Sequence, residues 1–170
     1  TADKPESVEI CFVPNDVYVS VLEQRLPADA PALVPGPIVT TDGETIGEHR
    51  GFARYTIGQR RGLPGGRALP LYVVAIRPDD RAVVVGDETD LEGRSVRLEE
   101  LNWLASPLGE GDRCEVQIRY RSRPVPAVVR QVTGTAIELD LSEGARAITP
   151  GQSGVLYGPD GLVFGGGVIA

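Results

Sequence analysis

The sequence predicts a mostly β protein made of two small β domains, a central one and a C-terminal β-barrel, preceded by a short helical N-terminal segment. Glycine and proline are abundant, with 21 and 14 of 170 residues, and both favour turns over long helices. From residue 37 onward, short apolar runs alternate with turn signals at intervals of about 8–12 residues. This spacing is typical of a small barrel or sandwich and argues against a helix bundle.

The first unit that we expect covers residues 1–34. Residues 8–13 alternate in polarity, as a strand does, and Cys11 lies on the less apolar face. Residues 17–26 carry apolar side chains at helical spacing, and a proline ends this helix. The proline-rich stretch 27–37 is interpreted as a linker or extended segment.

We expect two β domains after that linker, a central one over residues 35–107 and a barrel over 108–170. Asp42 and Gly43 are a strong two-residue hairpin signal, and residues 78–80 indicate a second hairpin. In the central domain the expected strands are 37–41, 71–76, 82–85, 95–98 and 101–104. In the C-terminal domain they are 114–120, 126–132, 136–141, 153–157 and 162–169.

Several functional classes are disfavoured by composition. No apolar run approaches the roughly 20 residues that cross a bilayer, and no signal-peptide pattern is present, so we expect no membrane partner. Cys11 and Cys114 are too few for a disulfide framework. With His49 they also lack metal-ligand spacing, so we expect no metal site. A cytoplasmic protein is the simplest interpretation.

The net charge of −7 hides an uneven distribution. Residues 1–48 hold nine acids against Lys4 and Arg25, which accounts for the whole excess. The remainder is neutral and contains two arginine clusters, which would suit a polyanion because binding depends on local patches. Solvated arginine faces are the alternative. The first cluster is Arg50, Arg54, Arg60, Arg61 and Arg67, and the second is Arg113, Arg119, Arg121, Arg123 and Arg130.

Cys11 is the only plausible nucleophile in the sequence. To act in sulfur chemistry, it would have to be a thiolate and not a thiol. The nearby Glu6 and Glu9 would raise its pKa, so activation would have to come from elsewhere in space. A buried, inert cysteine is the alternative, and Cys114 is interpreted as core. His49 could pair with a cysteine, but a hydrogen-bonded loop histidine fits its polar neighbours better.

Two basic segments could contact phosphate or bases. Residues 60–67 are rich in glycine and arginine but lack the Gly-Lys-Ser/Thr of a P-loop, so a flexible hairpin loop is the alternative. Arg119, Tyr120 and Arg121 place an aromatic ring between two guanidinium groups, which suits an unpaired base or a backbone phosphate. In a strand the ring would face away from the two arginines, so the three need not act together.

The order of several segments resembles the tRNA-specific 2-thiouridylase family over nearly the whole chain. The segments are residues 6–14, 49–63, 103, 119–121, 149–153 and 165–167. The resemblance is to the C-terminal part of that family: the end of the catalytic domain, the central domain and the C-terminal β-barrel domain. The sequence departs from the family's usual residues at Val8, Gly154, Leu156 and Phe164. None of these departures affects Cys11 or the Arg-Tyr-Arg block.

The resemblance implies a tRNA-uridine 2-sulfurtransferase that uses ATP and Mg to activate the wobble uridine. ATP and Mg would be bound by an N-terminal domain that we expect to be absent here, so the chain alone is expected to be inactive and to bind no cofactor. Cys11 matches the cysteine that carries the persulfide, and a persulfide sulfur-donor protein is the implied partner. Arg119, Tyr120 and Gln152 match positions that contact tRNA.

The sequence therefore predicts a piece of a tRNA-modifying sulfurtransferase that supplies tRNA-binding domains and one catalytic cysteine. Arg60, Arg61 and Arg121 complete the expected tRNA-binding set. One alternative is a non-catalytic RNA-binding β module in which Cys11 is incidental, and another is a small cysteine enzyme using Cys11 and His49. Sulfur transfer from a persulfide donor separates the first two, and the effect of His49→Ala on activity tests the third.

Overall fold

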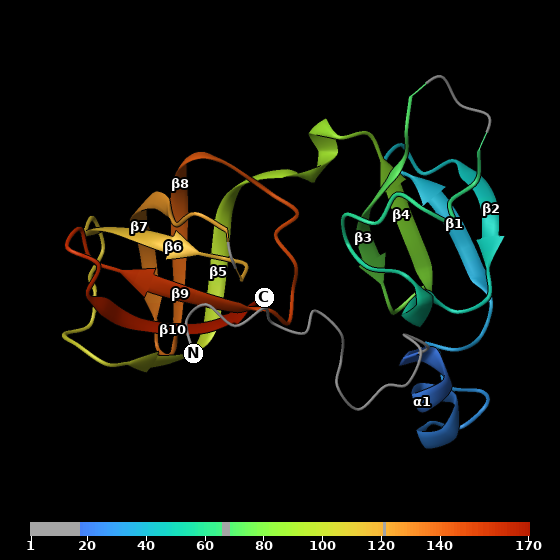
Figure 1. Cartoon of the computed structure of the whole chain (residues 1–170), viewed down its shortest axis with the longest axis horizontal. Helices are drawn as coiled ribbons and strands as arrows, with labels where there is room; N and C mark the ends of the chain where they lie inside the picture. The colour runs from blue at the N-terminus through green and yellow to red at the C-terminus, as the bar shows by residue number, and fades with distance from the viewer. Residues whose placement is uncertain (1–17, 66–68, 121) are drawn as a thin grey trace, which may run out of the picture.

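A computed structural model describes residues 18–65, 69–120 and 122–170 (Figure 1). The fold is mostly β, as predicted, with a four-stranded sheet and a closed barrel that lie beside each other in Figure 1. The helix α1 spans Tyr18–Arg25, within the predicted segment. Among the described residues, no helix is long and apolar enough to cross a membrane.

The central sheet has the strand order β2-β1-β4-β3. β1 pairs in parallel with β4, whereas the two outer pairs are antiparallel hairpins, which confirms both predicted turns. Every residue of β4 is buried, as expected for an inner strand covered on both faces. The strands are β1 (Gly36–Thr40), β2 (Thr45–His49), β3 (Tyr72–Arg77) and β4 (Ala82–Gly86).

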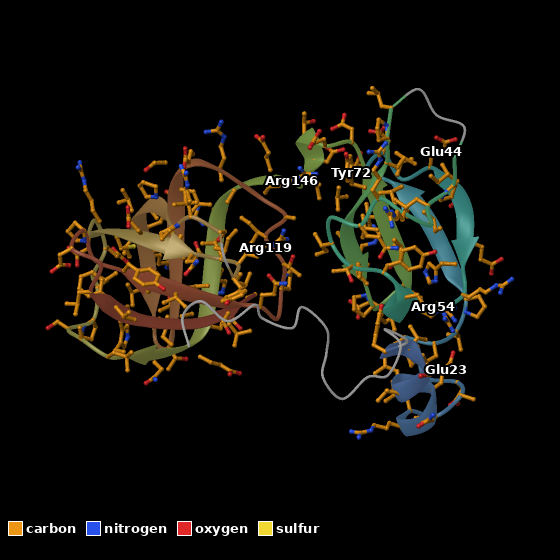
Figure 2. The ribbon with its side chains drawn as sticks, in the orientation of Figure 1. Glu23, Glu44, Arg54, Tyr72, Arg119 and Arg146 are labelled. Atoms are coloured by element: carbon orange, nitrogen blue, oxygen red, sulfur yellow. The ribbon has the colours of Figure 1, made fainter. Side chains whose placement is uncertain are left out.

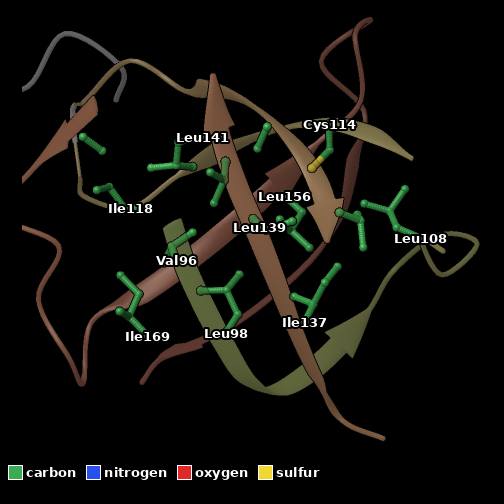
Figure 3. Packing of buried hydrophobic residues seen from close by; sticks show 14 residues of the cluster. Val96, Leu98, Leu108, Cys114, Ile118, Ile137, Leu139, Leu141, Leu156 and Ile169 are labelled. Carbon is green, nitrogen blue, oxygen red and sulfur yellow. The ribbon is translucent and has the colours of Figure 1, made fainter. Parts of the chain in front are cut away.

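The barrel closes in the order β10-β5-β8-β7-β6-β9, so none of its strands has a free edge. Alternate side chains point inward and form one apolar core, in which Leu98, Ile137 and Leu156 are fully buried (Figure 3). The strands are β5 (Glu92–Trp103), β6 (Arg113–Gln117), β7 (Val125–Thr133), β8 (Ala136–Arg146), β9 (Ser153–Tyr157) and β10 (Val163–Ile169).

The segment 95–104 belongs to the barrel and not to the central unit, in which the sequence places it. It forms a single long strand, β5, that pairs with β8 on one side and β10 on the other. The main chain of Glu100 has a φ of 53°, so the strand bends there without ending. The central sheet ends with β4, and the 3₁₀ helix Thr89–Leu91 leads into the barrel.

The glycines at 165–167 allow β10 to lie against its two neighbours. A Cβ atom added at Gly165 would lie 2.3 Å from the carbonyl oxygen of Asn102 on β5, and one at Gly166 would lie 2.6 Å from that of Gly154 on β9. Both distances are far shorter than any van der Waals contact. Glycine is therefore required at these positions for a structural reason, because the closed barrel leaves no room there for a side chain.

Candidate nucleic-acid interface

The loop that carries Arg60 and Arg61 is held in shape by Gln59. The Gln59 carbonyl accepts a hydrogen bond from the N–H of Val73 (2.9 Å), which ties the loop to β3. Its side-chain Oε1 accepts from the N–H of Thr56 (3.0 Å), while its Nε2 donates to the carbonyl of Arg61 (2.9 Å). Both arginines are exposed, and neither is in an ion pair with any residue that the structure describes.

The first arginine cluster is not uniform. Arg54 forms an ion pair with Glu23 of α1, with 2.6 Å between Nη2 and Oε1 (Figure 2). The Tyr18 hydroxyl donates to the carbonyl of Ala53, so α1 is fixed to the 3₁₀ helix Phe52–Arg54 at two points. Burial raises the pKa of Tyr18, and Arg54 opposes this increase. Arg54 therefore has its charge compensated by α1.

Arg119 and Tyr120 lie on a turn and not on the predicted strand. β6 ends at Gln117, and the N–H of Ser122 donates to the carbonyl of Arg119 (3.1 Å) to close the turn. The Gln117 side chain links this turn to β9. Its Nε2 donates to the carbonyl of Ser122 (2.7 Å), and its Oε1 accepts from the hydroxyl of Tyr157 on β9 (3.1 Å). The Tyr120 side chain is 71% exposed.

Arg119 contacts the loop between β8 and β9, which also contains Gln152. The Nη2 of Arg119 donates to the carbonyl of Ala147 (3.0 Å), and the Thr149 hydroxyl donates to the same oxygen (2.9 Å). Gln152 lies in this loop and donates its N–H to the carbonyl of Thr149 (3.3 Å). The N–H of Ala147 donates to the carbonyl of Leu91 (2.8 Å), in the segment that connects the two units.

The loop between β8 and β9, which contains Ala147 and Ile148, also contacts the central unit. We call the boundary between this loop and residues 57, 58 and 74 of the central unit the seam. A cavity of about 150 Å³ separates the loop from β3 and is lined by Ile57, Val74 and Ile148, among others. Ala147 lies against Gly58, two residues before Arg60. The contact of Ala147 with Gly58 therefore brings the start of the Arg60–Arg61 loop near the loop between β8 and β9, which Arg119 also contacts.

Arg146, the last residue of β8, crosses the seam with its side chain (Figure 2). Its Nη1 lies 2.8 Å from a carboxylate oxygen of Glu88, and its guanidinium carbon lies 5.3 Å from the centre of the Tyr72 ring on β3. An ion pair and a cation–π contact thus join the barrel to the central unit. The spacing of these residues along the chain gives no sign that they are partners.

Arg130, assigned to the second cluster by the sequence, is neutralised by acids on the barrel wall. Its Nε donates to Glu138 of the neighbouring strand (3.1 Å), and Nη1 lies 3.8 Å from Asp140. Arg97 also donates to Glu138 (3.2 Å). The hydrogen bond from Arg130, with a second one from Arg97, lowers the pKa of the Glu138 carboxyl. Arg130 is therefore a poor candidate for phosphate binding.

The remaining candidates are one core residue, one buried histidine and residues that lie outside the described part. Cys114 is 5% exposed in the barrel core, as predicted, and burial with Asp112 and Glu115 raises the pKa of its thiol to about 11. His49 is 2% exposed, at the end of β2. Cys11 and Arg121 lie outside the described residues, as does Arg67.

Two family models match the chain. One, described as an Aminomethyltransferase beta-barrel domain, matches residues 93–169. The other, described as a tRNA methyl transferase PRC-barrel domain, matches residues 19–87. The two matches divide the chain between β4 and β5, where the central sheet gives way to the barrel.

Curated relatives match nearly all of the chain. A tRNA-specific 2-thiouridylase MnmA of Dinoroseobacter shibae is 46% identical over 173 residues, which cover 99% of this chain and 44% of the relative. MnmA of Jannaschia sp. is 44% identical, with 99% and 45% covered. MnmA of Paracoccus denitrificans is 46% identical, with 99% and 43% covered. The chain belongs to the tRNA-specific 2-thiouridylase family. It spans less than half the length of these relatives.

The residues of the seam could not be predicted from the sequence. Ala147 and Arg146 stand in no motif, and neither Glu88 nor Tyr72 is close to them in sequence. The one signal in the sequence was the proximity of residues 145–148 to the Thr149–Ser153 segment on which the resemblance rests. Contacts between units depend on the whole fold, which no local pattern encodes.

Proposed function

We propose that this chain binds tRNA across the seam and that, in the whole protein, it takes part in 2-thiolation of the wobble uridine. The observation that carries the proposal is the pair of exposed arginine groups on either side of the seam. Arg60 and Arg61 extend from the central unit, and Arg119 extends from the barrel turn beside Tyr120. Guanidinium groups bind phosphate oxygens bidentately, and an exposed ring can stack on a base.

The chemistry that we propose for the whole protein uses ATP with Mg to activate the uridine, bound by a part of the protein that lies outside this chain. A donor protein supplies a persulfide on Cys11, and its outer sulfur bonds to the activated carbon of the base as the adenylate leaves. A second thiol, from a part of the protein outside this chain, then attacks the Cys11 sulfur, so that the S–S bond breaks, a disulfide forms and the transferred sulfur stays on the base. A thiolate is needed at that cysteine, because the thiol is a poor nucleophile. The described residues that we propose to contact tRNA are Arg60, Arg61 and Arg119.

A second candidate is an RNA-binding β module in which Cys11 is incidental. It is favoured by one observation: the cysteine that the structure describes, Cys114, is buried with a raised pKa and is unsuited to nucleophilic attack. Sulfur transfer separates the two candidates. In the full-length protein, Cys11→Ser should abolish thiolation with little change in tRNA affinity, whereas an incidental cysteine would leave thiolation intact.

The direct test of RNA binding is filter binding of an unmodified tRNA transcript to this chain at several salt concentrations. We expect saturable binding that weakens as salt rises, because each phosphate contact releases condensed counterions. A DNA-free preparation of the Cys11→Ser variant serves as control and should bind equally well. Absence of saturable binding at low salt would refute the proposal for the described units.

A further inference from the structure

Ala147 adopts a backbone conformation that residues with a Cβ atom rarely adopt. Its φ is 54°, in the left-handed region, and it is 4% exposed. Glycine or asparagine would normally occupy such a position. A conformation of this kind persists only where the surroundings fix it from several sides. At Ala147 three hydrogen bonds do so, with Leu91, Arg119 and Thr149 as partners.

The residue before Ala147 joins the two units, and the residue after it lines the cavity between them. Arg146 reaches Glu88 and Tyr72 on one side. Ile148 lines the seam cavity on the other. The conformation of Ala147 decides the directions in which these neighbours point, because one residue's φ and ψ set the course of the chain through it. The seam therefore depends on the contacts that keep Ala147 in place.

We propose that Arg119 is a positioning residue, which holds the Ala147 carbonyl and thereby fixes the Arg60–Arg61 loop at one spacing from the barrel turn. The chain would then offer RNA a single preformed surface across both units. This inference rests on the proposed tRNA binding and deepens it. It assigns to Arg119 a function that a contact with phosphate alone would not require.

A preformed surface is advantageous for RNA, which proteins recognise largely by shape and backbone. If the units moved freely, binding would have to restrict that motion, and affinity would fall by the corresponding entropy. Arg119 is suited to the task because its guanidinium has five N–H donors. One nitrogen, Nη2, reaches Ala147, and the side chain remains exposed beside Tyr120.

The first test measures the spacing of the units without RNA. Spin labels are placed on cysteines introduced at Glu48 of β2 and Gln131 of β7, both exposed, in a Cys11→Ser background. We expect a narrow distance distribution for this parent. Arg119→Met and Thr149→Val should each broaden it, because each removes one donor to the Ala147 carbonyl. Arg123→Met, an equal loss of charge at an exposed residue, should leave it narrow.

The second test measures tRNA affinity and its salt dependence in the same variants. Thr149→Val should weaken binding by about 3- to 10-fold, the range expected when one hydrogen bond is removed. It should leave the salt slope unchanged, because the variant keeps every charge. Arg119→Met should weaken binding at least as much.

Two results would overturn the inference. One is a distance distribution in Arg119→Met and Thr149→Val as narrow as that of the parent. The other is normal affinity in Thr149→Val together with a slope reduced by about one in Arg119→Met, which would mark Arg119 as a phosphate contact only. If the parent binds no tRNA, the proposed function fails, and the distances alone still decide whether Arg119 holds the seam.

Discussion

The imidazole Nε2 of His49 donates a hydrogen bond to the carbonyl of Arg81, 2.8 Å away, and so joins the end of β2 to the turn between β3 and β4. Its Nδ1 accepts a hydrogen bond from the N–H of Gly51 (3.0 Å), which fixes the neutral tautomer with the proton on Nε2. Both ring nitrogens are therefore occupied by main-chain groups. A catalytic base would need one of them free, so His49 is a structural residue.

Replacement of His49 by Ala should destabilise the central sheet. The change leaves the Arg81 carbonyl and the Gly51 N–H without their partner in a buried site and opens a cavity, so we expect a loss of about 2–4 kcal/mol. Urea unfolding followed by circular dichroism measures it. Glu48→Ala, at the exposed neighbouring residue, should change stability by no more than about 0.5 kcal/mol. Equal stability of the two variants would contradict this role for His49.

Gly167→Ala should destabilise the barrel by about 1–3 kcal/mol, the cost of forcing an extra group into a packed site. The added Cβ would lie 2.4 Å from the carbonyl oxygen of Glu99 on the neighbouring strand. Gly65→Ala is the matched control, because a Cβ there meets no atom of the described residues within 4 Å. Thermal unfolding compares the two. A Gly167→Ala protein that melts with the Gly65→Ala protein would disprove the steric explanation for the glycine run.

Cys114 should make stability depend on pH in the alkaline range. Burial raises the pKa of its thiol from 9.0 to about 11, so between these values the unfolded chain has lost the proton and the folded chain keeps it. Unfolding then releases a proton, and stability falls as pH rises from about 9 to 11. The wild type should lose up to ~2 kcal/mol relative to Cys114→Ala over this window. Parallel stability curves for the two proteins would refute this.

Alkylation should distinguish the two cysteines. Cys114 is buried in the barrel core, and its raised pKa leaves almost no thiolate at neutral pH, so brief iodoacetamide treatment should spare it. We expect Cys11 to react first. Mass spectrometry of the digested protein reads both sites, and urea-unfolded protein provides the positive control. Earlier labelling of Cys114 would show that the barrel core opens readily.

Local signals predicted most of the strands. The Asp42–Gly43 turn and the turn at residues 78–81 are short-range features, and both hairpins form as expected. β5 was assigned to the wrong unit because barrel closure is a long-range property. The pairing of Leu98 with Ile137 and Ile169 joins segments that are distant in sequence. The sequence also predicts two strands, 95–98 and 101–104, where the structure has one strand that bends at Glu100.

The arginine clusters show that the candidate site, like the strand pairing, could be predicted from the sequence only in part. Arg130 stands near Arg119 and Arg123 in sequence, but it faces Glu138 across the β7–β8 pair and is neutralised there. Sequence proximity counts charges along the chain, whereas binding depends on charges that share a surface. Arg119 was singled out from the sequence, but its bond to Ala147 was not, because an alanine in a left-handed conformation has no sequence signal.

The measurement that most directly tests the tRNA-binding account is the salt dependence of tRNA affinity in two double variants that remove equal charge. One is Arg60→Ala with Arg61→Ala, and the other is Arg81→Ala with Arg130→Ala, away from the seam. The account predicts that the first lowers affinity for every tRNA and reduces the slope of log K against log salt by about two, one for each phosphate that the variant no longer binds. It predicts that the second leaves the slope unchanged. An unchanged slope in the first variant, or an equal reduction in the second, would contradict it.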